Sequence, residues 1–296
     1  MSAMSAMKVW IEGRIVDGAD ARIPVTDHGL LYGDGVFEGI RLYGGRVFRL
    51  DAHLERLRHS ARAIGLELPG GAAAVREIVI ATARAYARAD GYVRLLVTRS
   101  DGAMGVDPTR CPSPRIVCIA CEIELYPEEK LRAGIDMVTV SVRRPPADVL
   151  DPRVKSLNYL NSVMAKREAR LRGADEALIL NMAGMVAEAA VANVFAFRRG
   201  ALLTPPATDG ALEGITRATV LELASGLGIP ARAETLSRMD LISADEVFLT
   251  GAGARVVGVR SLDGIAIGAR APGPVTEKVA AEFAAFTRRD GPVFLD

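Results

Sequence analysis

The sequence predicts an α+β protein of two domains. Its 296 residues suit one large domain or two modest ones, and half of them are hydrophobic, an ordinary globular composition. Residues 36–43 and 46–50 have the residue types of strands and flank Gly44-Gly45, which is typical of a β-hairpin. Asp51 then begins a pattern of apolar residues at helical spacing that continues to Ile64. This succession indicates an α+β domain built on an antiparallel sheet.

The remaining elements complete the two domains. In the first domain, residues 8–125, we expect strands at 9–11, 14–16, 92–98 and 115–124 and a helix at 72–89. A polar segment with a proline, residues 126–132, is the expected linker. In the second and larger domain, residues 133–296, we expect strands at 135–142, 176–180, 194–197 and 246–250 and helices at 160–172, 216–227 and 274–288.

Charge and composition argue against several kinds of partner. The formal net charge is +1, so no global field favours nucleic acid or anionic lipid. No apolar run approaches the roughly 20 residues of a membrane helix. Residues 1–7 lack the basic and apolar regions of a signal peptide, so we expect a disordered leader or an alternative start, and a cytoplasmic location.

The cysteines and histidines do not predict a metal site. Cys118 and Cys121 are three apart on a predicted strand and therefore point to opposite faces, so we interpret them as core cysteines. The three histidines, His28, His53 and His59, have no metal-ligand spacing.

Two charged residues are candidates for chemistry. Lys155 lies just before a predicted helix, although most lysines are simply solvated surface residues. Glu188 lies between small and apolar residues, where a buried acid needs a cationic partner such as a protonated pyridine nitrogen. An exposed acid on a loop is the plain alternative for Glu188.

The start of the helix at 216–227 is a candidate phosphate site. Gly214 and Thr216 precede an apolar helical pattern, and a helix N-terminus presents free amides and the positive end of the dipole. Taken alone, this feature is better explained by an ordinary capped helix start, because helix caps are universal.

Alternation along two strands indicates a possible substrate pocket. Phe37, Gly39, Arg41 and Tyr43 share one face of their strand, and Tyr92, Arg94 and Leu96 share a face of another. Each face combines an aromatic residue with an arginine, which suits an acidic yet partly apolar substrate. A solvent face with arginines extending to water is the alternative.

Together, residues 27–41, 155–159 and 212–217 resemble the fold-type IV enzymes that use pyridoxal 5′-phosphate (PLP), and most nearly the branched-chain amino acid aminotransferases of bacteria and archaea. The resemblance runs from about Lys8 to the C-terminus. It implies the D-amino-acid aminotransferase-like fold, with a small α+β domain, a linker folding over the site and a larger, α/β barrel-like domain that holds PLP. It also implies a homodimer or higher homo-oligomer in which the partner subunit completes the pocket.

The resemblance further implies roles for individual residues. Lys155 is the catalytic lysine that carries PLP as a Schiff base, and Glu188 pairs with its pyridine nitrogen. The other implied cofactor contacts are Tyr159 with the phenolic oxygen and, for the phosphate, Arg56, the amides of Ile215 and Thr216, and position Ala252, where the family has a hydroxyl. The implied substrate contacts are Tyr32, Phe37, Gly39, Arg41, Tyr92, Arg94, Met104, the linker residue Tyr126, and the amides of Ala252 and Gly253.

The chemistry implied is transamination between branched-chain L-amino acids and 2-oxoglutarate. The PLP ring accepts electrons from the substrate Cα, and the freed amine of Lys155 moves the Cα proton to the cofactor. One pocket must then accept both a branched apolar chain and a carboxylate chain.

Two segments depart from this family and keep alternatives open. Residues 188–193 read Glu-Ala-Ala-Val-Ala-Asn, whereas the branched-chain aminotransferases are glycine-rich here. In this segment the chain is more similar to the aminodeoxychorismate lyases of the same fold. Residues 250–255 carry Ala252 in place of a hydroxyl and Arg255 in place of an acid. Lys155-Ser-Leu-Asn also occurs in the D-amino-acid aminotransferases. A D-amino-acid or (R)-amine transaminase, a PLP lyase and a non-enzymatic binding protein are therefore the other hypotheses.

Overall fold

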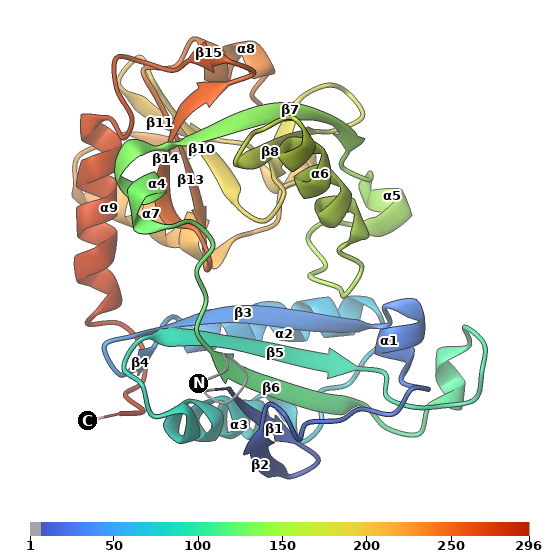
Figure 1. Cartoon of the computed structure of the whole chain (residues 1–296). Helices are drawn as coiled ribbons and strands as arrows, with labels where there is room; N and C mark the ends of the chain where they lie inside the picture. Colours follow the sequence, from blue (N-terminus) through green and yellow to red (C-terminus); the bar gives the residue numbers. More distant parts are fainter. Residues whose placement is uncertain (1–6, 296) are drawn as a thin grey trace. The chain divides into compact units, whose positions relative to one another are not determined.

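A computed structural model describes residues 7–295, which fall into two units (Figure 1). Unit 1 comprises the described residues up to Ile123 together with Val154–Asn158 and the segment from Thr287 onward, and unit 2 comprises Glu124–Arg153 and Tyr159–Phe286. The segments 154–158 and 287–295, which we predicted in the larger domain, thus group with unit 1. Of the predicted leader, only Met7 lies within the described residues.

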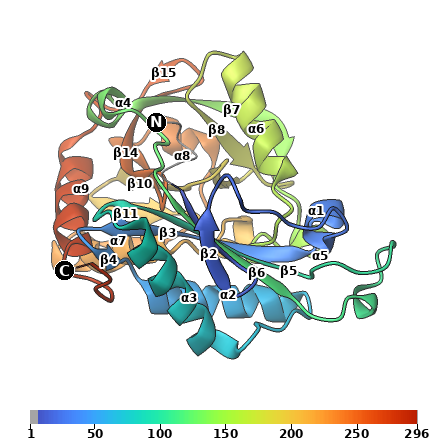
Figure 2. The same ribbon diagram turned by 60° about the horizontal axis from the view of Figure 1, so that its bottom comes forward.

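Unit 1 is a six-stranded sheet covered on one face by two helices. The sheet order is β2-β1-β6-β5-β3-β4, with every adjacent pair antiparallel. Its elements are β1 (Lys8–Ile11), β2 (Arg14–Asp17), α1 (His28–Tyr32), β3 (Gly35–Tyr43), β4 (Arg46–Val47), α2 (Leu50–Ala63), α3 (Gly71–Tyr86), β5 (Gly91–Thr98), the 3-10 turn η2 (Pro108–Arg110) and β6 (Arg115–Cys121). Helix α2 packs on β3 while α3 packs on β1 and β6, and the two helices lie side by side (Figure 2).

The alternation of β3 decides which side chains enter the core of unit 1. Val36, Ile40 and Leu42 are fully buried against Leu54 and Leu57 of α2. Phe37, Gly39, Arg41 and Tyr43 therefore point to the opposite face of the sheet. On β6, Cys118 is buried and Cys121 only half-buried, in keeping with opposite faces.

Unit 2 is built on one mixed sheet of nine strands. The order is β12-β11-β10-β13-β14-β7-β8-β9, with β15 paired to β14, and the β11–β12, β14–β7 and β7–β8 pairs are parallel. Its strands are β7 (Ile135–Arg143), β8 (Glu176–Leu180), β9 (Val186–Ala189), β10 (Asn193–Arg198), β11 (Ala201–Thr204), β12 (Ala231–Ala233), β13 (Glu246–Gly251), β14 (Arg255–Leu262) and β15 (Ile265–Ala266). The Ala189 amide donates to the Ala192 carbonyl, so β9 turns directly into β10.

The helices of unit 2 cover this sheet. They are α4 (Glu128–Ala133), α5 (Ala147–Leu150), α6 (Leu160–Leu171), the 3-10 turn η3 (Ala207–Asp209), α7 (Ile215–Gly226), α8 (Arg238–Ile242) and α9 (Pro274–Thr287). Helix α6 packs on β7 and β8, α7 on β13, and α4 on β14. The predicted α+β class is confirmed, whereas β9, β11 and β14 were not predicted because they are short or follow irregular turns.

Within the described residues, no helix has the length and apolarity to cross a membrane. The same residues contain no group of three or more His, Cys, Asp or Glu side chains placed to hold a metal ion.

A stacked aromatic pair is buried in unit 2. Phe195 of β10 and Phe248 of β13 are directly opposed in register and fully buried, with ring centroids 5.1 Å apart. The two rings therefore fix the packing between these strands.

We expect Phe248→Ala to lower the free energy of unfolding by about 3–5 kcal/mol, because it removes buried apolar surface and leaves a cavity. Denaturant unfolding followed by circular dichroism measures the loss. Met239→Ala, at a position 62% exposed, is the control and should change little. Equal effects of the two substitutions would contradict the importance of the aromatic pair.

Candidate active site

Lys155 lies on a short segment that pairs with the first residues of β3. The amide of Phe37 donates to the Lys155 carbonyl over 3.0 Å, and the amide of Leu157 donates to the Gly35 carbonyl over 2.9 Å. The Lys155 amide in turn donates to the Ser60 hydroxyl of α2, at 3.0 Å. The backbone on both sides of Lys155 is thus fixed by unit 1, although the neighbouring chain belongs to unit 2.

The Lys155 amine lies over an aromatic ring. Its Nζ is 4.5 Å from the centroid of the Phe37 ring, and the guanidinium carbon of Arg94 is 4.4 Å from the same centroid. Arg94 also lies 5.5 Å from the Tyr92 ring centroid. The structure therefore brings three other sequence-predicted residues to Phe37, with the two cations of Lys155 and Arg94 on an aromatic surface.

Gly39 and Arg41 extend this face along β3. A Cβ on Gly39 would collide with the Tyr92 hydroxyl, so the ring of Tyr92 lies directly on the glycine backbone. Arg41 is buried, donates to the Ile123 carbonyl over 3.3 Å and lies 5.4 Å from the Tyr43 ring centroid. The residues of this face on β3 are buried, which contradicts the alternative of a solvent face there, whereas Arg94 and Leu96 on β5 are half-buried.

Behind β3, Arg56 belongs to a buried charge network. Nε and Nη2 of Arg56 each donate to an oxygen of Glu38 at 2.8 Å, and His53 Nδ1 lies 2.7 Å from Glu38 Oε2. Burial by itself would raise the pKa of Glu38, but the charges and hydrogen bonds of Arg56 and His53 outweigh it and hold this pKa far below the usual range. Burial lowers the pKa of His53, an effect only partly opposed by Glu38.

Glu38 and His53 were not among the predicted site residues. The signal was present in the sequence, since Glu38 alternates with Val36 and Ile40 on an otherwise apolar face. The network presents Arg56 on a fixed bidentate support, which favours a defined guanidinium orientation.

In unit 2, Glu188 is a buried acceptor on β9. The side-chain amide of Asn193 and the backbone amide of Leu212 each donate to Glu188 Oε2 at 3.1 Å. Arg144 Nη2 lies 3.1 Å from Oε1. The alternative of an exposed acid on a loop is wrong, and Arg144, which we did not predict, supplies a cation within the chain.

The N-terminus of α7 lies beside this acid. Gly214 is the N-cap residue and provides no side-chain hydrogen bond, so the amides of Ile215 and Thr216 begin the helix without a side-chain cap. A Cβ on Gly214 would collide with Asn193 Oδ1, so only glycine allows this approach. Asn193 therefore connects Glu188 to the helix start.

A buried hydroxyl completes this part of unit 2. Thr250 pairs in register with Asn193, and its Oγ1 has no hydrogen-bond partner among residues 7–295. A buried carboxyl group, amides at a helix start without a side-chain cap and an unsatisfied hydroxyl fit a ligand that carries both a ring cation and a phosphate. Ala252 and Gly253 follow Thr250 in the turn between β13 and β14.

The remaining predicted residues have varied surroundings. Tyr159 is the N-cap residue of α6 and lines a surface cavity of about 280 Å³ with Val163 and Val191. The Tyr32 hydroxyl accepts a hydrogen bond from the Gly105 amide at 3.0 Å, and Met104 is 68% exposed.

Tyr126, which we predicted as the linker residue covering the substrate pocket, is buried within unit 2. Its ring belongs to the apolar core of unit 2, and its hydroxyl donates to Glu176 Oε2 at 2.6 Å. Burial and the negative charge of Glu176 raise the pKa of Tyr126. Lys166 lies 2.7 Å from the same carboxylate oxygen. This buried network explains the different position of Tyr126.

Comparison with known proteins identifies aminotransferases as relatives of this chain. A family model described as amino-transferase class IV matches residues 35–262. A putative branched-chain-amino-acid aminotransferase of Methanocaldococcus jannaschii is 46% identical over 278 residues, which cover 94% of this chain and 95% of that protein. A D-alanine aminotransferase of Bacillus licheniformis is 34% identical over 92% of this chain and 94% of its own length.

Solved structures agree with these matches. The branched-chain amino acid aminotransferase of Escherichia coli superposes with a TM-score of 0.92 at 35% identity and covers 96% of both chains. The branched-chain amino acid aminotransferase of Thermobaculum terrenum, solved in its PLP form, superposes with a TM-score of 0.86 at 30% identity, over 95% of this chain and 94% of that one.

The buried network around Glu38 yields a stability prediction. We expect Glu38→Gln to lower the free energy of unfolding by about 3–5 kcal/mol at neutral pH, because Arg56 and His53 lose the anion that they share. The stabilisation from Glu38 is fully present above its unfolded pKa, near 4.5, and is lost as the pH falls below that value, because the folded pKa is lowered. The difference in the free energy of unfolding between wild type and Glu38→Gln should therefore become smaller at acidic pH.

Urea unfolding at several pH values measures both effects. Asp51→Asn is the matched control, since Asp51 pairs with Arg76 but its side chain is 82% exposed. The control should change stability little at any pH. A constant gap between wild type and Glu38→Gln down to about pH 3 would contradict the assignment.

Proposed function

Because this chain belongs to the class IV aminotransferase family, we propose that it transfers the amino group of branched-chain L-amino acids to 2-oxoglutarate, with pyridoxal 5′-phosphate held covalently by Lys155. The observation that carries the proposal is Lys155 itself, whose backbone is fixed by β3 and α2 and whose amine lies over Phe37. The 46% identity to a putative branched-chain-amino-acid aminotransferase, over 94% of this chain, supports branched-chain amino acids as the substrate class.

The residues of unit 2 support the cofactor. Bound PLP supplies an electron sink for the substrate Cα. Glu188, oriented by Asn193 and Leu212, is the anion that would hold a proton on the pyridine nitrogen. The amides of Ile215 and Thr216 and the hydroxyl of Thr250 would hold the phosphate.

The residues of unit 1 support the proton transfer. Lys155 is a primary amine on a rigid backbone, so it can take the proton from the substrate Cα and deliver it to a second atom within reach. Arg56, on its Glu38 support, is the further proposed phosphate contact. Lys155 is thus the proposed base, and the hydrogen bonds that fix its backbone limit where its amine can move.

The face around Phe37 supports the substrate range. Phe37 and Tyr92 offer apolar rings to a branched side chain, and Arg94 offers a cation to the carboxylate of 2-oxoglutarate. A homodimer or higher homo-oligomer and a cytoplasmic location are proposed on the family resemblance alone. The proposed substrate contacts are completed by Tyr32, Gly39, Arg41, Met104 and the amides of Ala252 and Gly253.

The substrate proposal is tested by half-reactions with single amino donors. We expect the PLP-loaded protein to lose its lysine-linked visible absorbance rapidly with L-leucine, L-isoleucine or L-valine, and slowly with D-alanine or (R)-1-phenylethylamine. Conversion with D-alanine only would replace the proposal by a D-amino-acid aminotransferase, the activity for which one relative is named. Release of pyruvate from aminodeoxychorismate without a keto-acid acceptor would instead establish a lyase.

The lysine assignment is tested by substitution. We expect Lys155→Ala to lower kcat at least about 10³-fold and to abolish the lysine-linked absorbance, because both the covalent attachment and the proton-transferring amine are lost. Lys278→Ala, on the surface of α9, is the control and should keep full activity. An active Lys155→Ala variant that keeps this absorbance would exclude Lys155 as the attachment site.

A further inference from the structure

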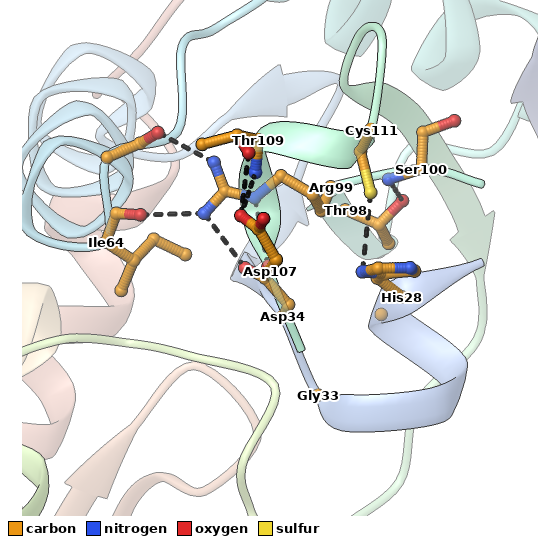
Figure 3. Close-up of polar contacts among 12 residues, drawn as sticks. His28, Gly33, Asp34, Ile64, Thr98, Arg99, Ser100, Asp107, Thr109 and Cys111 are labelled. Atoms are coloured by element: carbon orange, nitrogen blue, oxygen red, sulfur yellow. Dashed lines mark hydrogen bonds and ion pairs between the residues drawn. The ribbon is translucent and has the colours of Figure 1, made fainter. Parts of the chain in front are cut away.

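A buried histidine in unit 1 holds both ends of a surface loop. His28 is the first residue of α1 and is only 1% exposed. Its Nε2 lies 3.1 Å from the carbonyl oxygen of Ala103. Its Nδ1 lies 3.3 Å from the Cys111 sulfur (Figure 3). Ala103 and Cys111 are close to the two ends of the loop 102–111, so one imidazole ring fastens the loop twice.

The chemistry of the partners assigns the protons. A carbonyl oxygen can only accept, so Nε2 of His28 carries the hydrogen that is donated to Ala103. When the imidazole is neutral, the other nitrogen is an acceptor, and Nδ1 then receives the S–H of Cys111. Burial, followed by the negative charge of Asp34, raises the pKa of the Cys111 thiol, which keeps the donor protonated.

A third hydrogen bond ties the middle of the loop to the same helix. The Gly105 amide donates to the Tyr32 hydroxyl at 3.0 Å, and the Tyr32 ring lies edge-on to His28 with ring centroids 4.9 Å apart. The loop residues beside this bond, Met104 and Val106, are 68% and 79% exposed. Helix α1 and the loop therefore form one piece that sets the positions of Tyr32 and Met104.

This piece is attached to the Lys155 segment. Gly33 ends α1, and its carbonyl accepts a hydrogen bond from the Asn158 side chain at 3.0 Å. The next residue, Asp34, accepts from Arg99, whose guanidinium also donates to the Ile64 and Gly65 carbonyls after α2 (Figure 3). The helix, the loop and the Lys155 segment thus have little freedom relative to one another within unit 1.

We propose that His28 is a positioning residue for the amino donor, acting through the Cys111 hydrogen bond to hold loop 102–111 with Tyr32 and Met104 in the binding arrangement. His28 does not touch the substrate, so its effect falls on substrate affinity rather than on the proton transfer by Lys155. This role rests on the proposed function, in which Tyr32 and Met104 are substrate contacts.

The test compares two substitutions of Cys111 in the full-length, PLP-loaded protein. Cys111→Ser keeps a hydrogen-bond donor to Nδ1 of His28. Cys111→Ala removes that donor, and its side chain is nearly the same size as that of serine. We expect Cys111→Ala to raise KM for L-leucine about fivefold with kcat within about twofold of wild type, the scale of one lost hydrogen bond. Cys111→Ser should stay close to wild type in both constants.

Amide hydrogen exchange provides a readout that does not depend on turnover. Exchange at residues 103–106 should be about fivefold faster in Cys111→Ala than in Cys111→Ser, because the loop loses one of its anchors. Thr109→Val is the matched control, since it removes the 2.7 Å hydrogen bond from the Thr109 hydroxyl to Asp107 within the loop's own turn and leaves the His28 contacts in place. It should change neither KM nor the exchange at 103–106.

The outcomes distinguish the role of His28 from the proposed function. If wild type turns over L-leucine and the Ser and Ala variants agree in both KM and exchange, the role of His28 is wrong and the function stands. If Cys111→Ala exchanges faster but lowers kcat instead of raising KM, the positioning of the donor is also wrong. If wild type does not act on branched-chain amino acids, the proposed function fails, and equal loop exchange in the two variants would then overturn the anchoring as well.

Discussion

The pairing of residues 154–158 with the start of β3 is the constraint on which the site in unit 1 depends. The chain leaves unit 1 after Ile123, returns for five residues and then leaves again. Two backbone hydrogen bonds to β3 and one to Ser60 fix these five residues. A lysine side chain is long and flexible, so a rigid backbone is the main means of limiting where its amine can reach. The amine that we propose for proton transfer is thus positioned by sheet hydrogen bonding.

Both units contain a buried acid, and each acid is stabilised differently. Glu38 is held by two side-chain cations or donors from α2 and behaves as part of the scaffold beneath the sheet. Glu188 is held by an amide side chain, a backbone amide and Arg144. A carboxylate that accepts several hydrogen bonds remains charged in a low-dielectric environment. Glu188 is therefore a fixed, oriented acceptor, as the pyridine nitrogen that we propose as its partner requires.

The features predicted correctly from the sequence are those with local causes. The hairpin at Gly44-Gly45, the amphipathic α2 and the alternation that separates Phe37 from Val36 all follow from spacing within a few residues. The residues that were missed or misplaced depend on contacts far apart in the chain. Tyr126 meets Glu176 fifty residues later, Arg144 reaches Glu188, and the Lys155 segment returns to β3. No periodicity or turn signal encodes such pairings, and only the family resemblance linked the separate motifs.

The contact between Gly39 and Tyr92 limits how the proposed substrate face of this enzyme can be redesigned. The phenol oxygen of Tyr92 occupies the volume in which a methyl group at position 39 would stand. A larger residue at position 39 therefore requires the Tyr92 side chain to shift or to lose its hydroxyl. Such pairs give strongly non-additive effects. A mutational library that varies the two positions jointly would therefore reveal combinations that are missed when each position is varied alone, and would open space along β3 next to Phe37.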